Sequence, residues 1–170
     1  VGNGNNIHQA TAVSIGLGNV REIAGGQSHS LALVADGTVR AWGYDQNGQL
    51  GNGVTTDGGS SNVPVSVSGL SGVVTIAAGN SHSLASRGSG QIAAWGANGN
   101  GQLGNSSTTG SNIPVYYFTN SRRVFAGGDH SISQQAWGGM FIWGANGSGQ
   151  CGNATTTDKT SPGSNIGSYM

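Results

Sequence analysis

Ala-Gly-Gly-Gln-Ser-His-Ser-Leu-Ala-Leu at residues 24–33, followed by Ala-Trp-Gly at 41–43, decides the fold because both segments return along the chain. The second copy reads Ala-Ala-Gly-Asn-Ser-His-Ser-Leu-Ala (77–85) and Ala-Ala-Trp-Gly (93–96). The third begins with Ala-Gly-Gly-Asp-His-Ser (126–131), which is one residue shorter by this alignment, and continues to Ile-Trp-Gly. Self-similarity at a period of about 50 residues is the sequence signature of a repeat architecture.

The distance from histidine to tryptophan is constant within each copy. Each histidine of a His-Ser pair is followed by a tryptophan 13 positions later, whereas successive copies lie 53 and 48 residues apart. A constant internal distance combined with variable spacing indicates a rigid unit joined by loops that tolerate insertion. The residues at these repeated positions are His29, His82, His130, Trp42, Trp95 and Trp143.

Each unit divides into four short apolar runs. Asp36-Gly37, between two such runs, predicts a two-residue hairpin turn of type I′. Pro64 and Pro114 are expected to open the outermost strands, because proline cannot donate a hydrogen bond to a sheet. The predicted strands of the first unit are residues 20–26, 29–35, 38–42 and 63–67.

Four strands in about 50 residues, without helical periodicity, are typical of a β-propeller blade. The predicted fold is therefore all-β, with three full blades of four antiparallel strands and an extra N-terminal outer strand near 13–15. The last blade is expected to end in a weak outer strand around 166–169. Since a ring needs at least about four blades, this is a partial propeller unless other chains or a longer parent chain complete it. The predicted divisions are 1–19 as the tail of a preceding repeat, then blades at 20–72, 73–123 and 124–170.

The combined motifs resemble the repeat of the regulator of chromosome condensation family. The resemblance rests on the His-Ser and Trp-Gly segments and on Asn-Gly-Gln-Leu-Gly-Asn-Gly (47–53), Asn-Gly-Gln-Leu-Gly-Asn (100–105) and Gly-Gln-Cys-Gly-Asn (149–153). It covers nearly the whole chain and implies a propeller that closes with seven blades. It also implies binding of other proteins at the blade ends, or nucleotide exchange on a small GTPase, the activity for which the family is named.

The composition narrows the range of partners. Only 7% of the residues are charged, the formal net charge is zero, and the longest basic cluster is Arg122-Arg123. Nucleic-acid binding is not expected, because it needs a concentrated basic surface. The apolar runs are also too short to span a bilayer. Cys151 aligns with Leu50 and Leu103, which favours a buried structural thiol over a reactive one.

The repeated histidines and tryptophans have structural and functional interpretations. Equivalent residues on adjacent blades lie too far apart to share one zinc ion, so the histidines are expected to bond turn backbone rather than to bind a metal. The three repeated tryptophans are expected to wedge between blades. Trp137 departs from the repeat and is the predicted contact residue, with incidental packing as the alternative. No cofactor is expected, and an enzyme is not expected either, because Glu22 is the single glutamate and the aspartates fall in turns or loops.

Three functions remain at this stage. The favoured one is a non-catalytic scaffold that binds an unidentified protein. The second is an extracellular or cell-surface structural subunit, such as a coat or filament. The third is nucleotide exchange, which would need an inserted wedge and a charged face. If the chain is complete, the apolar faces of the end blades predict a homo-oligomer or filament.

Overall fold

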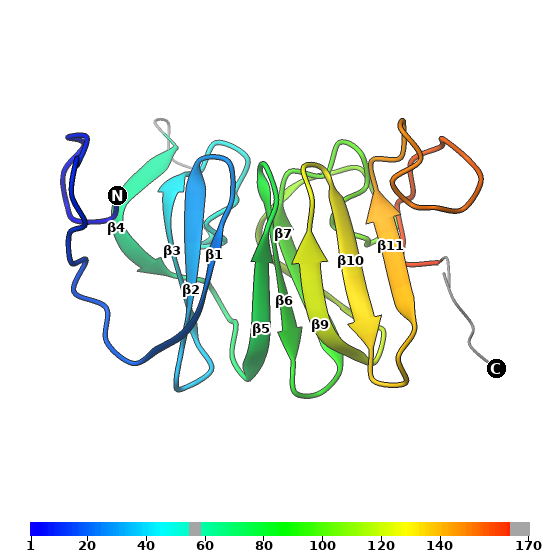
Figure 1. The fold of residues 1–170 in the computed structure, drawn as a ribbon, viewed down its shortest axis with the longest axis horizontal. Coiled ribbons are helices and arrows are strands. Elements are labelled where there is room, and N and C mark those ends of the chain that lie inside the picture. The colour runs from blue at the N-terminus through cyan, green and yellow to red at the C-terminus, as the bar shows by residue number, and fades with distance from the viewer. Residues whose placement is uncertain (55–58, 164–170) are drawn as a thin grey trace.

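A computed structural model describes residues 1–54 and 59–163, and every regular element among them is a β-strand. The strands form three antiparallel sheets of four, four and three strands that stand side by side (Figure 1). This confirms the predicted all-β class and its propeller blades. The strands are β1 Val20–Gly25, β2 His29–Val34, β3 Val39–Tyr44 and β4 Ser60–Ser66 in blade 1; β5 Val73–Ala78, β6 His82–Arg87, β7 Gln91–Gly96 and β8 Ser111–Phe118 in blade 2; β9 Ser121–Ala126, β10 His130–Gln135 and β11 Met140–Gly144 in blade 3.

Each sheet is a meander in which neighbouring strands follow one another along the chain. In blade 1, Ser30 on β2 lies opposite Trp42 on β3, and in blade 2, Ser83 lies opposite Trp95. Residues that face each other across an antiparallel pair project from the same side of the sheet. The repeat therefore places one serine and one tryptophan side by side on the same face of every blade.

The turn between β2 and β3 differs from the predicted type I′ turn. The amide of Gly37 donates to the carbonyl of Val34 at 2.9 Å, and Gly37 has a φ of 80° while Asp36 is not in the left-handed region. The loop is thus a three-residue hairpin, a type I turn followed by a left-handed glycine. The prediction was wrong because Asp-Gly suits either turn, and the register of the flanking strands decides between them.

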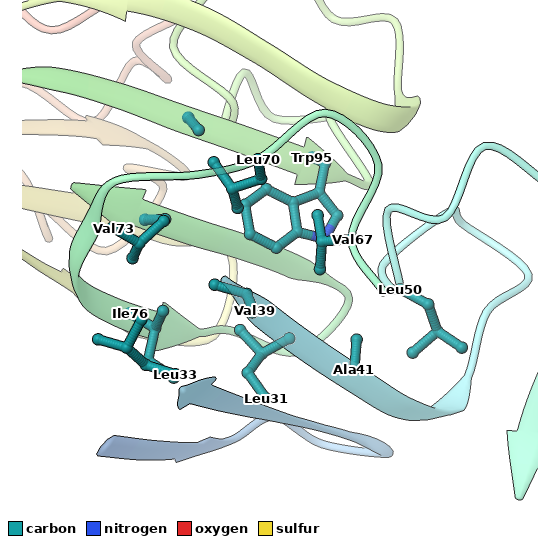
Figure 2. Close-up of a cluster of buried hydrophobic side chains, with 12 residues drawn as sticks. Leu31, Leu33, Val39, Ala41, Leu50, Val67, Leu70, Val73, Ile76 and Trp95 are labelled. Carbon is teal, nitrogen blue, oxygen red and sulfur yellow. The ribbon is translucent and has the colours of Figure 1, made fainter. Parts of the chain in front are cut away.

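The apolar core lies between neighbouring blades. Leu31 and Leu33 of β2 pack in one cluster with Ile76 of β5 and the indole of Trp95 on β7 (Figure 2). A second cluster joins blade 2 to blade 3 and includes Trp143. Each sheet thus buries one face against the next sheet, and the stability of a blade depends on its neighbour.

Equivalent residues on the inner strands show how strongly burial depends on a neighbouring blade. Ile76 on β5 and Val124 on β9, which each have a blade before them, are 4% and 3% exposed. Ile23 at the same position of β1 is 76% exposed. The side chain is apolar in all three repeats, so its burial is decided by the adjacent sheet rather than by its own.

The outer strands begin earlier than the prolines that were expected to open them. Pro64 is the fifth residue of β4 and Pro114 the fourth of β8. Both lie where the pairing register shifts, opposite the segments Ala41 to Gly43 and Ala94 to Gly96. A proline is tolerated inside these strands because a residue at a bulge is not paired with the neighbouring strand, so its missing N–H costs no hydrogen bond there.

The N-terminal segment does not contain the predicted outer strand, since residues 13–15 are irregular. Residues 2–4 lie on blade 1 instead. Gly2 packs so closely that a Cβ on it would come within 2.9 Å of the Trp42 ring, and the amide of Gly4 donates to the carbonyl of Asn62 on β4 at 2.8 Å. Residues 13–15 were expected to form the outer strand of a preceding repeat, but the described residues offer them no strand to pair with.

The same close contact is made at both joints between blades. A Cβ on Gly51 would lie 2.7 Å from the Trp95 ring, and one on Gly104 would lie 2.6 Å from the Trp143 ring. The Gly-Asn segment that follows each loop therefore docks against the tryptophan of the next blade. Residues 2–4 make this contact with blade 1.

Blade 3 has three strands within the described residues, and its predicted outer strand at 166–169 lies outside them. Lys159 forms an isolated antiparallel bridge with Gly144. The third motif is not shortened: the Gly127 amide donates to the His130 carbonyl at 3.0 Å, as the Gly26 amide does to its histidine. The alignment that made the third motif one residue shorter was wrong. Phe125 stands where the first repeat has Ala24, so the match between Gly127 and Gly26 is hidden in the sequence.

Replacing Gly51 with valine should destabilise the fold by about 3 kcal/mol, because the new side chain would overlap the Trp95 ring in a left-handed backbone conformation. Urea denaturation measures this loss. Gly99→Ala is the control: nothing lies within 4 Å of its Cβ position, so its stability should change by less than about 0.5 kcal/mol. Equal effects of the two substitutions would contradict the proposed close packing.

Candidate functional site

A buried polar link joins blade 1 to blade 2. The carbonyl oxygen of Gln49 accepts hydrogen bonds from the Ser83 hydroxyl and the Trp95 indole, both at 2.9 Å. The Ser83 hydroxyl is also 2.9 Å from Nε2 of His29. These four residues are buried, and they come from the loop after β3, from β2 and from two strands of the next blade.

The second joint repeats this link. The backbone carbonyl oxygen of Gln102 accepts hydrogen bonds from the Ser131 hydroxyl at 2.7 Å and from the Trp143 indole at 2.9 Å. Nε2 of His82 lies 2.9 Å from the Ser131 hydroxyl. Polar groups removed from water need partners, and here each partner belongs to the neighbouring repeat. Because the two joints have the same geometry, the link is part of how the repeats stack.

The link determines the protonation of the histidines. Because the Ser83 hydroxyl proton goes to Gln49, its oxygen accepts from His29, and the ring proton therefore sits on Nε2. Nδ1 of His29 is buried without a hydrogen-bond partner among the described residues. A second proton on Nδ1 would have no acceptor, and burial lowers the pKa of His29 to about 4 and that of His82 to about 3.

These contacts differ from the expected bonds between histidine and turn backbone. The rings of His29 and His82 bond a serine of the next blade instead. The sequence did not reveal these partners because each histidine and its serine are 54 or 49 positions apart, although the repeated His-Ser pair was a signal that both residues serve the repeat. In the described part of the chain, no three His, Cys, Asp or Glu side chains gather closely enough to hold a metal ion.

The remaining repeated residues lie at the two ends of the row of blades. Trp42 and His130 are half-buried, whereas Trp95 and Trp143 are fully buried. The described residues place no histidine against Ser30, the counterpart of Ser83. The polar link is thus complete at the two internal joints.

Trp137 lies on the turn between β10 and β11 and is 54% exposed. Its indole folds back over Gly139, where any Cβ would clash with the ring. Trp137 takes the place that Asp36 has in the first hairpin, and Gly138 follows it with a φ of 96°. The indole is therefore held open to solvent at the end of a blade, apart from the joints.

Aspartate and asparagine side chains support the loops that follow the third strand of each blade. The Asp45 carboxylate accepts the Leu50 amide at 2.8 Å, and Asn98 and Asn146 bond the matching amides in the next two repeats. Asp158 accepts the Asn146 amide at 2.8 Å. Since asparagine replaces Asp45 in two repeats, the oxygen acts as a hydrogen-bond acceptor that shapes the loop and needs no charge.

Cys151 is fully buried at the position of Leu50 and Leu103. Burial raises the pKa of its thiol, which keeps the sulfur protonated and disfavours reaction. Among the described residues, no helix is long and apolar enough to cross a membrane.

The stacked meanders and their polar links define a class of protein: a β-propeller built from repeats. The family model described as "Regulator of chromosome condensation (RCC1) repeat" matches residues 36–86 and 89–133, and a second model with the same description matches 20–49 and 73–102. The chain belongs to this family.

Curated relatives share the repeat over part of their length. The ultraviolet-B receptor UVR8 of Arabidopsis thaliana is 38% identical over 97 residues, which cover 56% of this chain and 21% of the receptor. Protein pim1 of Schizosaccharomyces pombe is 36% identical over 97 residues, covering 51% of this chain and 18% of pim1. The chain therefore spans about a fifth of the length of these relatives.

Solved structures agree with the fold. Prp20p of Saccharomyces cerevisiae superposes with a TM-score of 0.79 at 26% identity, over 90% of this chain and 39% of Prp20p. Yeast RCC1 (Prp20) bound to Kap60 gives the same TM-score at 25% identity, over 90% of this chain and 38% of the other. Human WBSCR16 superposes with a TM-score of 0.73.

Replacing Ser83 with alanine should destabilise the protein by about 1–3 kcal/mol, because the buried Nε2–H of His29 would lose its acceptor. Chemical denaturation of the purified variant measures the effect. Ser30→Ala is the matched control at the same repeat position, where the described residues supply no histidine, and it should change stability by less than about 0.5 kcal/mol. Identical losses in the two variants would argue against the link.

Stability should fall as the pH falls from about 6.5 toward 4. Unfolded histidine titrates near 6.5, whereas folded His29 and His82 titrate near 4 and 3, so the unfolded state binds more protons throughout this interval. Each histidine contributes up to about 1.4 kcal/mol per pH unit.

Denaturation midpoints measured across this pH range would show the dependence. His82→Gln should weaken the pH dependence of the stability. His8→Gln, which alters an exposed histidine outside the repeat, should leave that dependence unchanged. A wild-type protein with constant stability over this range would refute the expectation.

Proposed function

We propose that this chain is a non-catalytic recognition scaffold whose hairpin turns contact another protein. The observation that carries the proposal is Trp137, a large apolar side chain that is 54% exposed and held against Gly139. Exposed, ordered tryptophans are enriched at sites of protein binding because they bury a large area with little loss of conformational freedom. The other three tryptophans serve the blades themselves.

The relatives support a role in protein binding. Solved structures of similar propellers describe yeast RCC1 (Prp20) bound to Kap60, and the binding properties of Prp20p to Gsp1p and histones. This chain spans less than two fifths of those proteins. What carries over is the use of a propeller surface for binding, and the partner of this chain is unidentified.

The chemistry of the described residues supports a non-catalytic role. Asp45 and Asp158 hold loop amides, and the hydroxyls of Ser83 and Ser131 are committed to the joints. A nucleophile or general base needs a free, positioned group within reach of a substrate. These four side chains are occupied in maintaining the fold.

Self-association is a second candidate, favoured by the outer face of blade 3. Met140 is 40% exposed, while the equivalent Val39 and Ile92 are at most 1% exposed because a following blade covers them. Another blade could cover this face and create a homo-oligomer or filament. An extracellular or cell-surface structural role would follow from such assembly and stays a prediction. Nucleotide exchange has the least support, since the described loops supply neither an inserted wedge nor a strongly charged face.

Trp137→Ala should abolish selection of binding peptides while leaving the fold intact. The immobilised protein would be used to select from a random peptide display library, and we expect enrichment with the wild type but not with the variant. Because Trp137 is on an exposed turn, its removal should alter stability by less than about 1 kcal/mol.

Ile7→Ala is the matched control, since Ile7 is also exposed and apolar but lies in the N-terminal segment. This variant should select the same peptides as the wild type. Recovery of identical peptides with Trp137→Ala would contradict a recognition role for the turn.

A further inference from the structure

The charged residues are divided between the two ends of the blades. The hairpin end, where β2, β6 and β10 finish, is drawn at the bottom of Figure 1, and the long loops lie at the opposite end. All five arginines lie in the half nearer the hairpin turns, with two acidic residues, Glu22 and Asp36. The long-loop end has three described aspartates and one lysine. The arginines are Arg21, Arg40, Arg87, Arg122 and Arg123.

A groove of about 250 Å³ opens at the hairpin end between blades 2 and 3. Arg87 and the 88–90 turn line one side, and Arg122 and Ala136 line the other. Val74 contributes an apolar wall. We call this depression the hairpin groove. Trp137 is the next residue after Ala136, so it lies on the turn that borders the groove.

Arg87 is held in place within the hairpin groove. Its Nε donates to the carbonyl of Ser71 at 2.9 Å, and Nη1 donates to Oε1 of Gln91 at 2.7 Å. The guanidinium also lies over the Tyr116 ring, 5.5 Å from its centre. These neutral partners orient the guanidinium and leave its charge uncompensated.

Arg122 is exposed and has a fixed backbone. Its carbonyl accepts a hydrogen bond from the Ser86 hydroxyl at 3.2 Å, which ties β9 to blade 2 beside the groove. Asp36 is engaged by the amide and hydroxyl of Thr38 in blade 1. The hairpin groove therefore has two positive side chains and a tryptophan on a bordering turn, and its lining contains no carboxylate among the described residues.

We propose that the hairpin groove binds an acidic peptide segment of a partner protein. A carboxylate of the segment lies between Arg87 and Arg122, and an apolar side chain packs on Trp137. Hydrogen bonds between guanidinium and carboxylate are strong and directional. The indole adds apolar surface that is buried when the peptide binds. The inference rests on the recognition function above and names the chemistry of its partner.

The observations favour a peptide over a nucleic acid. Nucleic-acid affinity comes from many simultaneous phosphate contacts, whereas this groove offers two arginines in a chain with zero net charge. A groove of this size matches a short side-chain motif better than a continuous phosphate backbone.

Three fluorescein-labelled peptides of equal length test the proposal by fluorescence anisotropy. Each has the same Phe-Leu centre, flanked by glutamates, serines or lysines. We expect the glutamate peptide to bind most tightly, with an affinity that falls as salt is added, and the lysine peptide to bind most weakly. Arg122→Gln should weaken binding of the glutamate peptide about tenfold.

Lys159→Gln, which removes one positive charge at the opposite end, is the matched control and should leave binding unchanged. Denaturation midpoints of both variants would show that they fold. Equal binding of the glutamate and serine peptides would overturn the acidic specificity but keep the recognition surface. Binding of none of the three would overturn the surface as well. Binding of a fluorescein-labelled oligothymidylate more tightly than the glutamate peptide would assign the groove to nucleic acid and overturn the proposal.

Discussion

The backbone carbonyl of a buried glutamine is the contact on which the arrangement of the blades depends. At each internal joint, this single oxygen accepts both a serine hydroxyl and a tryptophan indole from the next repeat. Apolar packing supplies most of the attraction between sheets, but it tolerates sliding. Two directional bonds to one oxygen define a single register, because any displacement would leave buried donors unpaired.

The histidine completes this arrangement and links it to pH. His29 and His82 donate to the serine that bonds the carbonyl, and their second nitrogen has no described acceptor. The joint is therefore suited to neutral histidine. A residue type often associated with metals or catalysis is used here as a fixed donor between sheets, which explains its repetition without any enzymatic function.

Much of the architecture could be predicted from local pattern. The alternation of apolar residues and the constant interval from His29 to Trp42 correctly predicted the repeats, the first three strands of each blade and the position of the hairpin turn between the second and third strands. The errors arose where the outcome depends on strand pairing. Register decided the turn type at Gly37, a bulge accommodated Pro64 within β4, and residues 13–15 have no strand to pair with among the described residues.

The sequence by itself determined the unit, its period and the position of Trp137 on a turn, because these follow from spacing and from residue preferences that act over a few positions. Only the tertiary structure decided the partners of His29 and His82 and the proximity of Arg87 to Arg122 in one groove. These groups are separated by tens of residues along the chain. Their proximity depends on how one sheet packs on the next, and no local preference encodes it.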